Sequence, residues 1–429
     1  MTEPGRPSQE PSASDGVATS PGDRARQLVA WAREEGFTRA GIALLEPSQY
    51  GGFYRRWLAA EHHAGMAWME RRLDERDDPA RLLPGARAAL CVALQYHPLV
   101  GEEEPGGDLW PRVARYARGR DYHDVMGRRL KRLAARIREA YPGAETRPYV
   151  DTGPIREREL AERAGLGVVG KHTNLFHRRW GSWFLIGEVL TTLELEPTVS
   201  TEPSDLCGQC TLCLEACPTD ALPEAYRLDS RRCISYWTIE HRGDFPTEVR
   251  EMVGDWVFGC DLCQEACPWN DRPRRGEPLP GDEPLLRLPE VRRELDLAGL
   301  LALDREGYVA RFQVSPMKRA KLEGLQRNAA VAMGNRGDRD YVGPLAEALC
   351  GHPSESVRRH AAWALGQIGG EAARRVLRSV LVSITAPATA DSVAEPSPPW
   401  DPGLVGEIRS ALERSEGGAG DARGRPKVP

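Results

Sequence analysis

The stretch Cys207-Gly-Gln-Cys210-Thr-Leu-Cys213-Leu-Glu-Ala-Cys217-Pro218 and its counterpart Cys260-Asp-Leu-Cys263-Gln-Glu-Ala-Cys267-Pro268 contain seven of the ten cysteines of this chain, and Cys233 lies between them. Closely spaced cysteines that end in Cys-Pro are typical of folds that hold two 4Fe–4S clusters, in which the cysteine before the proline reaches the other cluster. The two runs therefore predict a ferredoxin-like domain with two such clusters, and a protein that delivers electrons.

The same spacing assigns four thiolates to each cluster. The triplet of the first run takes the last cysteine of the second run as its fourth ligand, whereas the second run is one ligand short and only Cys233 is left nearby. The expected sets are Cys207, Cys210, Cys213 and Cys267 for the first cluster, and Cys217, Cys233, Cys260 and Cys263 for the second. Two zinc sites would need neither the triplet nor the Cys-Pro endings. A disulfide framework would need an oxidising compartment, of which the sequence gives no sign.

The length and composition fit a protein of two or three domains. The chain has 429 residues and a formal net charge of -5, which neither favours nor excludes an acidic partner. No apolar run approaches the roughly 18 residues of a membrane span. Residues 1–24 are rich in Pro, Ser, Gly and Glu, fit no export signal and are expected to form a disordered tail. We therefore expect a cytoplasmic protein without a membrane partner.

Two segments are strongly basic. From Arg112 to Arg138 there are ten Lys and Arg residues, opposed only by Asp121 and Asp124. Apolar residues recur at helical spacing within this segment, so its arginines would lie on the solvated face of a helix. The second segment contributes Arg311, Lys318, Arg319, Lys321 and Arg327. An ordinary solvated helix would also show the first pattern, but two basic surfaces on a mildly acidic protein favour a phosphate backbone as partner.

Residues 25–197 are expected to form an α/β domain, because strand and helix patterns alternate along them. The expected strands are Arg39–Leu44, Ala88–Tyr96 and Thr146–Asp151, and Ser182–Leu195 is expected to form a further strand or a hairpin. The expected helices are Arg24–Glu35, Tyr54–Glu75, the basic helix and Arg156–Ala164. The cluster domain follows at 198–285 and is expected to be short and rich in loops.

An internal repeat marks residues 286–385 as helical. The string Leu325-Gln-Arg-Asn-Ala-Ala-Val-Ala-Met-Gly334 matches Val357-Arg-Arg-His-Ala-Ala-Trp-Ala-Leu-Gly366 further along the chain. Pairs of helices with this repeat resemble HEAT repeats, which usually provide a binding surface. Residues 386–429 are expected to be a linker and tail, with one short helix at Leu404–Arg414.

Two strings imitate cofactor motifs. Gly165-Leu-Gly-Val-Val-Gly170 matches the dinucleotide fingerprint, but it follows a helical segment where the fingerprint requires a strand. Asp121-Tyr-His123-Asp-Val-Met-Gly127 nearly matches a signature in which histidine binds the cobalt of a corrinoid. Its glycine is one position late, so we do not expect His123 to be a cobalt ligand.

Six further segments combine with the eight cysteines into one pattern. They are Gly65-Met-Ala-Trp-Met69, Tyr116-Ala-Arg-Gly-Arg-Asp-Tyr-His123, Tyr149-Val-Asp-Thr-Gly-Pro-Ile-Arg-Glu-Arg-Glu159, Ala164-Gly-Leu-Gly-Val-Val-Gly-Lys-His172, Gly181-Ser-Trp-Phe184 and Cys233-Ile-Ser-Tyr236. From about residue 25 to 380, the chain resembles epoxyqueuosine reductase, the cobalamin-dependent iron–sulfur enzyme of the last step of queuosine synthesis in tRNA. The resemblance includes the helical repeats, which many members of that family carry.

The resemblance implies a base-off cobalamin between the α/β domain and the cluster domain, reduced through the two clusters. It implies that the enzyme reduces epoxyqueuosine to queuosine at the wobble position of tRNA anticodons. It also implies that Asp151 donates a proton to the leaving oxygen, a role for which a buried, weakly polar site would keep the carboxyl protonated. Without the resemblance, Asp-Thr-Gly-Pro before a helix would favour a helix N-cap.

Other site residues also follow from the resemblance alone. The residues implied to contact cobalamin are Arg71, Asp151, Lys171, His172 and Ser182, although many members have Lys-Asn where this chain has Lys-His. Asp121 and Tyr122 lie in a motif expected to face the modified nucleoside. The arginines expected to bind tRNA phosphates are Arg128, Arg132, Arg319 and Arg327.

Two rival functions remain open on the sequence. Reductive dehalogenases also combine a corrinoid with two clusters, but this chain shows no export signal and carries a repeat region suited to a large ligand. An electron-transfer module fused to a scaffold would need no cobalt and no Asp151. An external electron donor is expected in every case, and a monomer is the simplest assembly.

Overall fold

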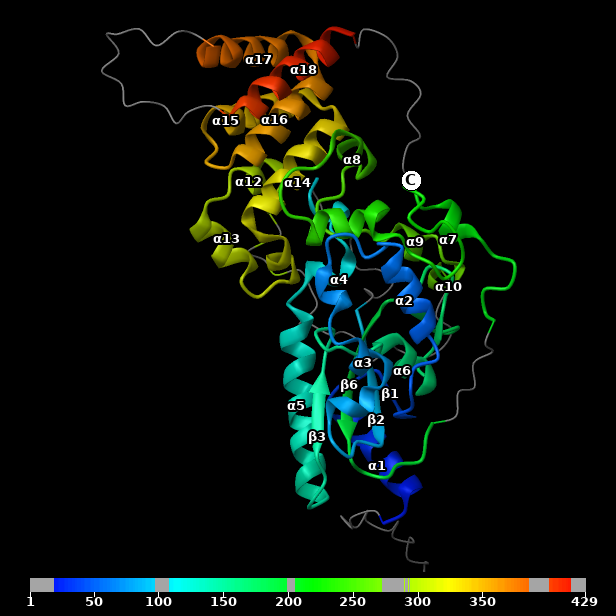
Figure 1. The fold of residues 1–429 in the computed structure, drawn as a ribbon. Coiled ribbons are helices and arrows are strands. Elements are labelled where there is room, and N and C mark those ends of the chain that lie inside the picture. Colours follow the sequence, from blue (N-terminus) through cyan, green and yellow to red (C-terminus); the bar gives the residue numbers. More distant parts are fainter. Residues whose placement is uncertain are drawn as a thin grey trace, which may run out of the picture.

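The computed structural model describes residues 19–96, 108–198, 205–271, 289, 292, 294–385 and 401–417. The N-terminal domain lies at one end of the molecule and the helical C-terminal domain at the other, with the cluster domain between them on one side (Figure 1). Most of the expected N-terminal tail and much of the expected C-terminal linker and tail lie outside the described residues. Across the described ranges, no helix is long and apolar enough to cross a membrane.

One antiparallel sheet forms the centre of the N-terminal domain. Its strands are β1 (Arg39–Leu44), β2 (Ala88–Gln95), β6 (Phe184–Thr191) and β3 (Thr146–Tyr149), in that order across the sheet. Every neighbouring pair is antiparallel. The strands lie where the sequence predicts them, but their pairing corrects the expected α/β class: the domain is of the α+β type, since the described strands of this sheet form only antiparallel pairs. A separate hairpin consists of β4 (Val168–Val169) and β5 (Leu175–Phe176).

The helices of this domain follow the prediction with one exception. They are α1 (Pro21–Glu34), α2 (Gly51–Ala59), η1 (Ala67–Glu70), α3 (Leu73–Asp77), η2 (Pro79–Leu82), η3 (Trp110–Arg112), α4 (Arg115–Arg118), α5 (Tyr122–Ala140) and α6 (Glu157–Arg163). The single helix expected over Tyr54–Glu75 is divided into α2, η1 and α3. Glu61, Ala64 and Arg72 adopt left-handed backbone angles there, which a continuous right-handed helix excludes.

Helices cover both faces of the sheet, which explains why β2 is apolar along its whole length. Successive strand residues point to opposite faces. Leu90 and Val92 join a core with residues of α1 and α5, whereas Ala89 and Cys91 join a core with residues of α6. Cys91 is fully buried there as a small core residue.

The cluster domain is built from short helices and loops. They are α7 (Leu212–Glu215), η4 (Ser230–Arg232), η5 (Tyr236–Glu240), α8 (Thr247–Met252), α9 (Leu262–Glu265) and α10 (Pro268–Asp271). Its apolar residues share one core with the helical domain. The buried amide of Asn328 connects the two parts, because it donates to the backbone oxygens of Thr238 and Val257 at 2.8 Å each. The expected boundary near residue 285 therefore separates sequence patterns and not two independent cores.

The C-terminal domain stacks helices in the order that the repeat predicts. They are α12 (Leu297–Leu301), α13 (Arg305–Phe312), η7 (Pro316–Ala320), α14 (Lys321–Arg336), η8 (Arg339–Tyr341), α15 (Val342–Gly351), α16 (Glu355–Ile368), α17 (Gly370–Thr385) and α18 (Pro402–Gly417). The repeated glycines allow close crossings: a Cβ on Gly334 would lie 2.8 Å from Ala364 Cα, and one on Gly366 would lie 2.8 Å from Ala411 Cα.

Helix α18 lies in the segment that was expected to be a linker and tail. The short helix predicted at Leu404–Arg414 is longer and packs on α16 as a further layer of the stack. Leu404, Ile408 and Ala411 are buried in the common core. The residues between α17 and α18 lie outside the described part.

Candidate active site

Eight cysteines, seven from the two runs together with Cys233, lie in two groups beside the N-terminal domain. Burial, and then the other thiols of its own group, raise the pKa of Cys213 to about 11. Burial and then Cys233 raise the pKa of Cys263 well above its ordinary value. Thiols placed so close together stay ionised only when a cation binds them. The interacting thiols are Cys207, Cys210, Cys213 and Cys267 in one group, and Cys217, Cys233, Cys260 and Cys263 in the other.

Two adjoining cavities lie between the N-terminal domain and the cluster domain. The smaller has a volume of about 420 Å³ and is lined by all four cysteines of the second group. The larger has a volume of about 1530 Å³ and extends toward the N-terminal end of α5 and the helical domain. Asp151, Tyr122 and Glu157 line both cavities, so these side chains stand where the two spaces meet.

His172 presents an unpaired donor to the smaller cavity. Its Nδ1 accepts the N–H of Asn174 at 3.1 Å, which leaves the proton of the neutral ring on Nε2. Burial, and then Arg158, lower the pKa of His172 to about 4, so the ring is neutral at pH 7. Nε2 is buried and has no hydrogen-bond partner among the described residues. A buried donor without a partner costs about 1–3 kcal/mol, and a polar oxygen of a bound cofactor would remove that cost.

The other residues expected to contact cobalamin are placed differently. Ser182 lines the smaller cavity, and its hydroxyl donates to Gln264 beside Cys263 at 2.9 Å. The ammonium of Lys171 donates to the backbone oxygens of Gly208 and Cys210, at 2.6 and 2.9 Å, and so holds the loop of the first cysteine group. Arg71 is exposed and lines neither cavity. The structure therefore brings His172, Ser182 and Asp151 together, but not Lys171 or Arg71.

Asp151 follows β3 in a loop and has a left-handed backbone with φ of 56°. Its side chain is 59% exposed to the open cavities, and it does not cap α6, whose N-cap residue is Arg156. The phenol of Tyr122 donates to Asp151 Oδ2 at 2.7 Å, and His123 Nε2 lies 3.4 Å from the same oxygen. Burial would raise the pKa of Asp151, but the hydrogen bonds from His123 and Tyr122 outweigh it and lower the pKa. The carboxyl is therefore ionised at rest, contrary to the expectation that its site keeps it protonated.

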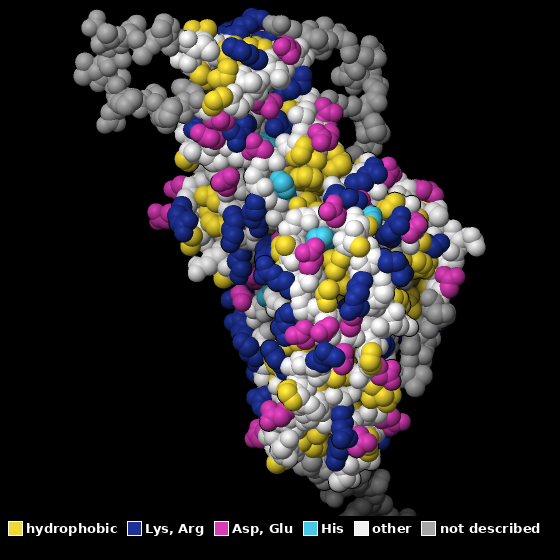
Figure 2. All heavy atoms as spheres, viewed as in Figure 1, with side chains coloured by type: hydrophobic (Ala, Val, Ile, Leu, Met, Phe, Trp, Pro, Cys, Tyr) yellow, Lys and Arg dark blue, Asp and Glu magenta, His cyan; other side chains and the backbone are white. Residues whose placement is uncertain are grey.

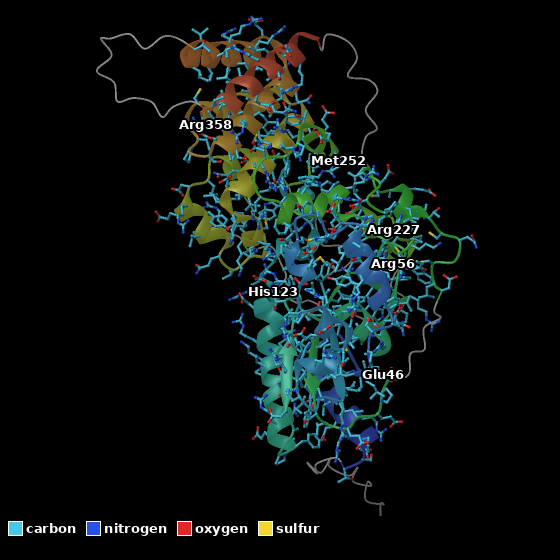
Figure 3. The ribbon with its side chains drawn as sticks, viewed as in Figure 1. Glu46, Arg56, His123, Arg227, Met252 and Arg358 are labelled. Atoms are coloured by element: carbon cyan, nitrogen blue, oxygen red, sulfur yellow. The ribbon has the colours of Figure 1, made fainter. Side chains whose placement is uncertain are left out.

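His123 bridges two carboxylates, a role that the sequence did not suggest. It lies at the N-terminal end of α5, toward the helical domain (Figure 3). Its Nδ1 lies 2.8 Å from Asp121 Oδ1. Burial would lower its pKa, but the hydrogen bonds to Asp121 and Asp151 outweigh it and raise the pKa to about 9. His123 is thus a protonated neighbour of Asp151, while Asp121 is 2% exposed and serves as the N-cap of α5.

Two further carboxyl groups lie behind Asp151. Glu157 accepts the backbone N–H of Asp151, and burial and then Asp151 raise the pKa of Glu157 to about 8. Glu188 of β6 is fully buried, and neither of its carboxyl oxygens has a partner among the described residues. Burial and then Glu157 raise its pKa well above the ordinary value. Glu157 lies within a motif of the resemblance, but no local pattern marks either residue as functional.

The basic face of α5 consists of Arg128, Arg129, Lys131, Arg132, Arg136 and Arg138. Figure 2 shows a band of Lys and Arg side chains along this edge of the molecule, continuing toward α13. Arg128 is exposed, and Arg132 is 59% exposed although it pairs with Glu35 at 2.7 Å. Arg319 lines the larger cavity, pairs with Glu240 at 2.8 Å and lies over the ring of Trp68.

The structure corrects the prediction that Arg327 binds tRNA phosphates. It is 2% exposed, and its guanidinium donates to the backbone oxygens of Gly243 and Trp237 and lies over the ring of Phe245. Since no phosphate can reach it, Arg327 holds the cluster domain against α14 and does not bind tRNA.

Three families of domains match consecutive parts of the chain. Residues 76–152 match the epoxyqueuosine reductase QueG domain, residues 206–270 match the 4Fe-4S double cluster binding domain, and residues 319–394 match HEAT repeats. The second match spans all eight cysteines of the two groups and confirms the predicted iron–sulfur region. The third confirms the predicted repeats.

Relatives with the same domains cover almost the whole described structure. Solved structures of epoxyqueuosine reductase include one labelled with selenomethionine (TM-score 0.78, 28% identity) and one with a tRNA-Tyr epoxyqueuosine-modified stem loop (TM-score 0.77, 28% identity), each covering 91% of this chain and 98% of the other. A third, from Bacillus subtilis, has the catalytic loop of an aspartate swung out of the active site (TM-score 0.75, 27% identity, 91% of this chain and 98% of the other).

Curated relatives give the stronger sequence match. The epoxyqueuosine reductase of Xanthomonas campestris pv. campestris is 40% identical over 360 residues, which cover 81% of this chain and 97% of the relative. That of Pseudomonas aeruginosa is 39% identical over 368 residues, which cover 84% of this chain and 99% of the relative. Because the match extends over nearly the full length of these relatives, this chain belongs to the epoxyqueuosine reductase family.

Proposed function

We propose that this protein reduces epoxyqueuosine to queuosine at the wobble position of tRNA anticodons, the last step of queuosine synthesis. The named relatives support this proposal, as does the solved relative with an epoxyqueuosine-modified stem loop. The observation that carries it is the position of Asp151 at the meeting point of two cavities. One cavity reaches the cysteines of the second cluster, and the other extends to the N-terminal half of α5, where Lys131 of the basic face lines it.

The proposed cofactor is a base-off cobalamin in the space next to the second cluster. When bound and reduced through the clusters, it would supply the two-electron chemistry at cobalt that side chains cannot provide. The two cavities together exceed the roughly 300–1,000 Å³ of a pocket for a drug-sized ligand, so they suit a macrocycle beside a nucleoside. The unpaired Nε2–H of His172 would donate to a polar oxygen of the cofactor. The first cluster, where Cys210 is exposed, would receive electrons from an external donor.

Asp151 would move protons to the oxygen that leaves the substrate. Opening the epoxide to an alkene breaks two C–O bonds and consumes two electrons and two protons, with the oxygen released as water. Asp151 Oδ2 already accepts a hydrogen bond from Tyr122 and forms an ion pair with His123. A carboxylate in contact with the imidazolium of His123 can take up its proton and pass it to the substrate. The exposed fraction of Asp151 is larger than that of His123, 59% against 35%, so the aspartate is the one that faces the open space.

The tRNA would bind across α5 and the start of the helical repeats. Enzymes that act on an anticodon base take it out of the stack, while basic residues bind the surrounding phosphates. Lys131 of α5 and Arg319 of the helical domain both line the larger cavity. Arg128 and Arg132 extend the same surface along α5.

Anaerobic reconstitution with iron, sulfide and cobalamin tests the proposal. The reduced protein is mixed with epoxyqueuosine-containing tRNA, and mass spectrometry of the nucleosides follows the loss of one oxygen. We expect conversion that requires cobalamin and is abolished in Asp151→Ala. The matched control is Asp338→Ala, since Asp338 is an exposed aspartate that caps η8 and lines neither cavity.

The other outcomes separate the rival functions. A protein that binds eight irons and cobalamin but converts no tRNA would contradict the proposal and favour a halogenated substrate. Eight irons without retained cobalamin would favour an electron-transfer module.

A further inference from the structure

The proposed reaction needs two protons, but Asp151 can hold only one. Its carboxyl contacts His123 on one side, and on the other side the backbone N–H of Asp151 donates to Glu157 Oε1. Glu157 lies in the first turn of α6, whereas Asp151 lies in the loop after β3. Both side chains line both cavities. Two carboxyl groups in one small site cannot easily ionise together, so a proton is expected to stay on one of them.

We propose that Glu157 stores the second proton of the reaction and passes it through Asp151 to the leaving oxygen. This inference rests on the proposed function and adds a residue to it. When bound, the clusters would supply the two electrons of the reaction, while His123 provides the first proton and Glu157 the second. Both C–O bonds of the epoxide break, the C=C bond forms, and the oxygen leaves as water. Solvent that enters the larger cavity returns both protons afterwards.

The surroundings of Glu157 favour its neutral form. Asp151 faces it from the loop after β3 and Glu188 from β6, while His123 of α5 and Arg158 of its own helix are the nearby cations. Arg158 donates to the backbone oxygen of Thr173 at 2.8 Å. Glu188 offers no compensating charge, because it is fully buried without partners and is itself neutral. The raised pKa of Glu157 agrees with this arrangement.

A structural role for Glu157 is the alternative, and the chain allows the two roles to be separated. Glu157 also anchors the left-handed backbone of Asp151, and in the solved Bacillus subtilis relative the loop of a catalytic aspartate is swung out of the active site. Glu157→Gln keeps an oxygen that accepts the N–H of Asp151 but removes the titrating proton, whereas Glu157→Ala removes both. A residue that only anchors the loop would tolerate glutamine.

The first measurement needs neither tRNA nor cobalamin. Infrared spectroscopy in H₂O and D₂O detects the carbonyl stretch of a protonated carboxyl at pH 7 in the protein with its clusters. We expect Glu157→Gln to remove one such band. Glu162→Gln is the matched control, because Glu162 lies on the same helix and also accepts a backbone N–H, that of Val169, at 2.8 Å. An unchanged spectrum in Glu157→Gln would overturn the proton store whatever the protein reduces.

The second measurement is the pH profile of a single turnover with the reconstituted protein. The rate of the wild type should fall as the pH rises through about 8, where Glu157 loses its proton. In Glu157→Gln, we expect a rate lower by roughly 10²-fold and without this fall, while Glu162→Gln keeps the wild-type profile. A wild-type rate and profile in Glu157→Gln would contradict proton transfer by this residue. If the wild type shows the infrared band but converts no tRNA, the proposed function is contradicted, whereas the conclusion that Glu157 is protonated at pH 7 still holds.

Discussion

Replacement of His172 by phenylalanine tests whether this residue holds the proposed cofactor. The ring packs beside Phe176, with centroids 5.9 Å apart, and next to Gly170, where a Cβ would lie 2.9 Å from the imidazole Cε1. Phenylalanine can occupy this space, but it lacks both nitrogens. The variant therefore removes the unpaired Nε2–H, at the cost of the acceptor for the N–H of Asn174.

The expected loss of cobalamin affinity follows from comparing the variant without cofactor and with cofactor. Without cofactor, the loss of a bond of about 1 kcal/mol to Asn174 is offset by removal of a buried donor that lacks a partner. With cofactor, an acceptor would be left buried and unpaired, which costs about 1–3 kcal/mol and weakens binding by about 5- to 150-fold. Spectroscopic titration with cobalamin measures the affinity, and urea unfolding of the cofactor-free protein measures the stability.

His177→Phe is the matched control for this prediction. His177 is also a buried histidine whose Nδ1 accepts a backbone N–H, that of Arg179, at 3.1 Å, but it lines neither cavity. We expect His177→Phe to keep the affinity for cobalamin. An affinity of His172→Phe within twofold of the wild type would refute the assignment of Nε2 to the cofactor.

Three further predictions concern packing, RNA binding and pH. Gly366→Ala should lower the free energy of unfolding by about 1–3 kcal/mol, because its Cβ would meet the backbone of Ala411; Gly406→Ala on α18, where a Cβ meets nothing within 4 Å, should be neutral or stabilising in the same denaturation assay. Lys131→Ala should weaken tRNA binding and reduce the slope of log K against log salt by about one, and an unchanged slope would exclude a phosphate contact. The pKa of His172 is about 4 and that of His177 about 3, whereas the unfolded chain takes up these protons near about 6.5. Stability should therefore fall as the pH drops below about 6.5, and His172→Phe should flatten this fall between about pH 6.5 and 4 in urea unfolding.

Features that depend on local patterns were predictable from the sequence. The cysteine spacing predicts an iron–sulfur region, which the match to the double cluster binding domain confirms, while the assignment of individual cysteines to each cluster stays a prediction. Each run is a short loop followed by a short helix, α7 or α9. Strand β1 has the bounds that the apolar pattern indicates, and β2 ends one residue earlier. The repeated glycines mark the helix crossings, because a close approach of two backbones excludes a side chain at that position.

Features that depend on distant residues were not predictable. Alternating strands and helices are compatible with parallel or antiparallel pairing, and only the contacts of β6 with β2 and β3 decide it. The basic residues of the second segment were grouped by charge alone, which placed Arg327 with Arg319 as a phosphate-binding residue. In the structure, Arg327 of α14 points into the core, where its guanidinium donates to backbone oxygens. Glu188 lies on a central strand, and nothing in its neighbours along the chain indicates that Asp151 and Glu157 are close to it.

The helical repeats help to build the active site as well as to extend its surface. Asp121 holds His123 in place, and two residues of the helical domain hold Asp121. Lys318 Nζ lies 2.7 Å from the carboxylate of Asp121, and the backbone N–H of Asp121 donates to the backbone oxygen of Val314 at 2.7 Å. At 2% exposure, this carboxylate depends on such partners, because a buried charge without them is strongly destabilising. Burial would raise the pKa of Asp121, but the hydrogen bonds from His123 and then Lys318 outweigh it and lower the pKa to about 2. Asp121 therefore stays ionised and stabilises the imidazolium of His123. In the proposed mechanism, the proton passed from His123 to Asp151 would therefore depend on the segment around Lys318, which belongs to the helical domain and is distant from α5 in the chain. This dependence requires a fixed position of the helical domain, which the core that it shares with the cluster domain provides.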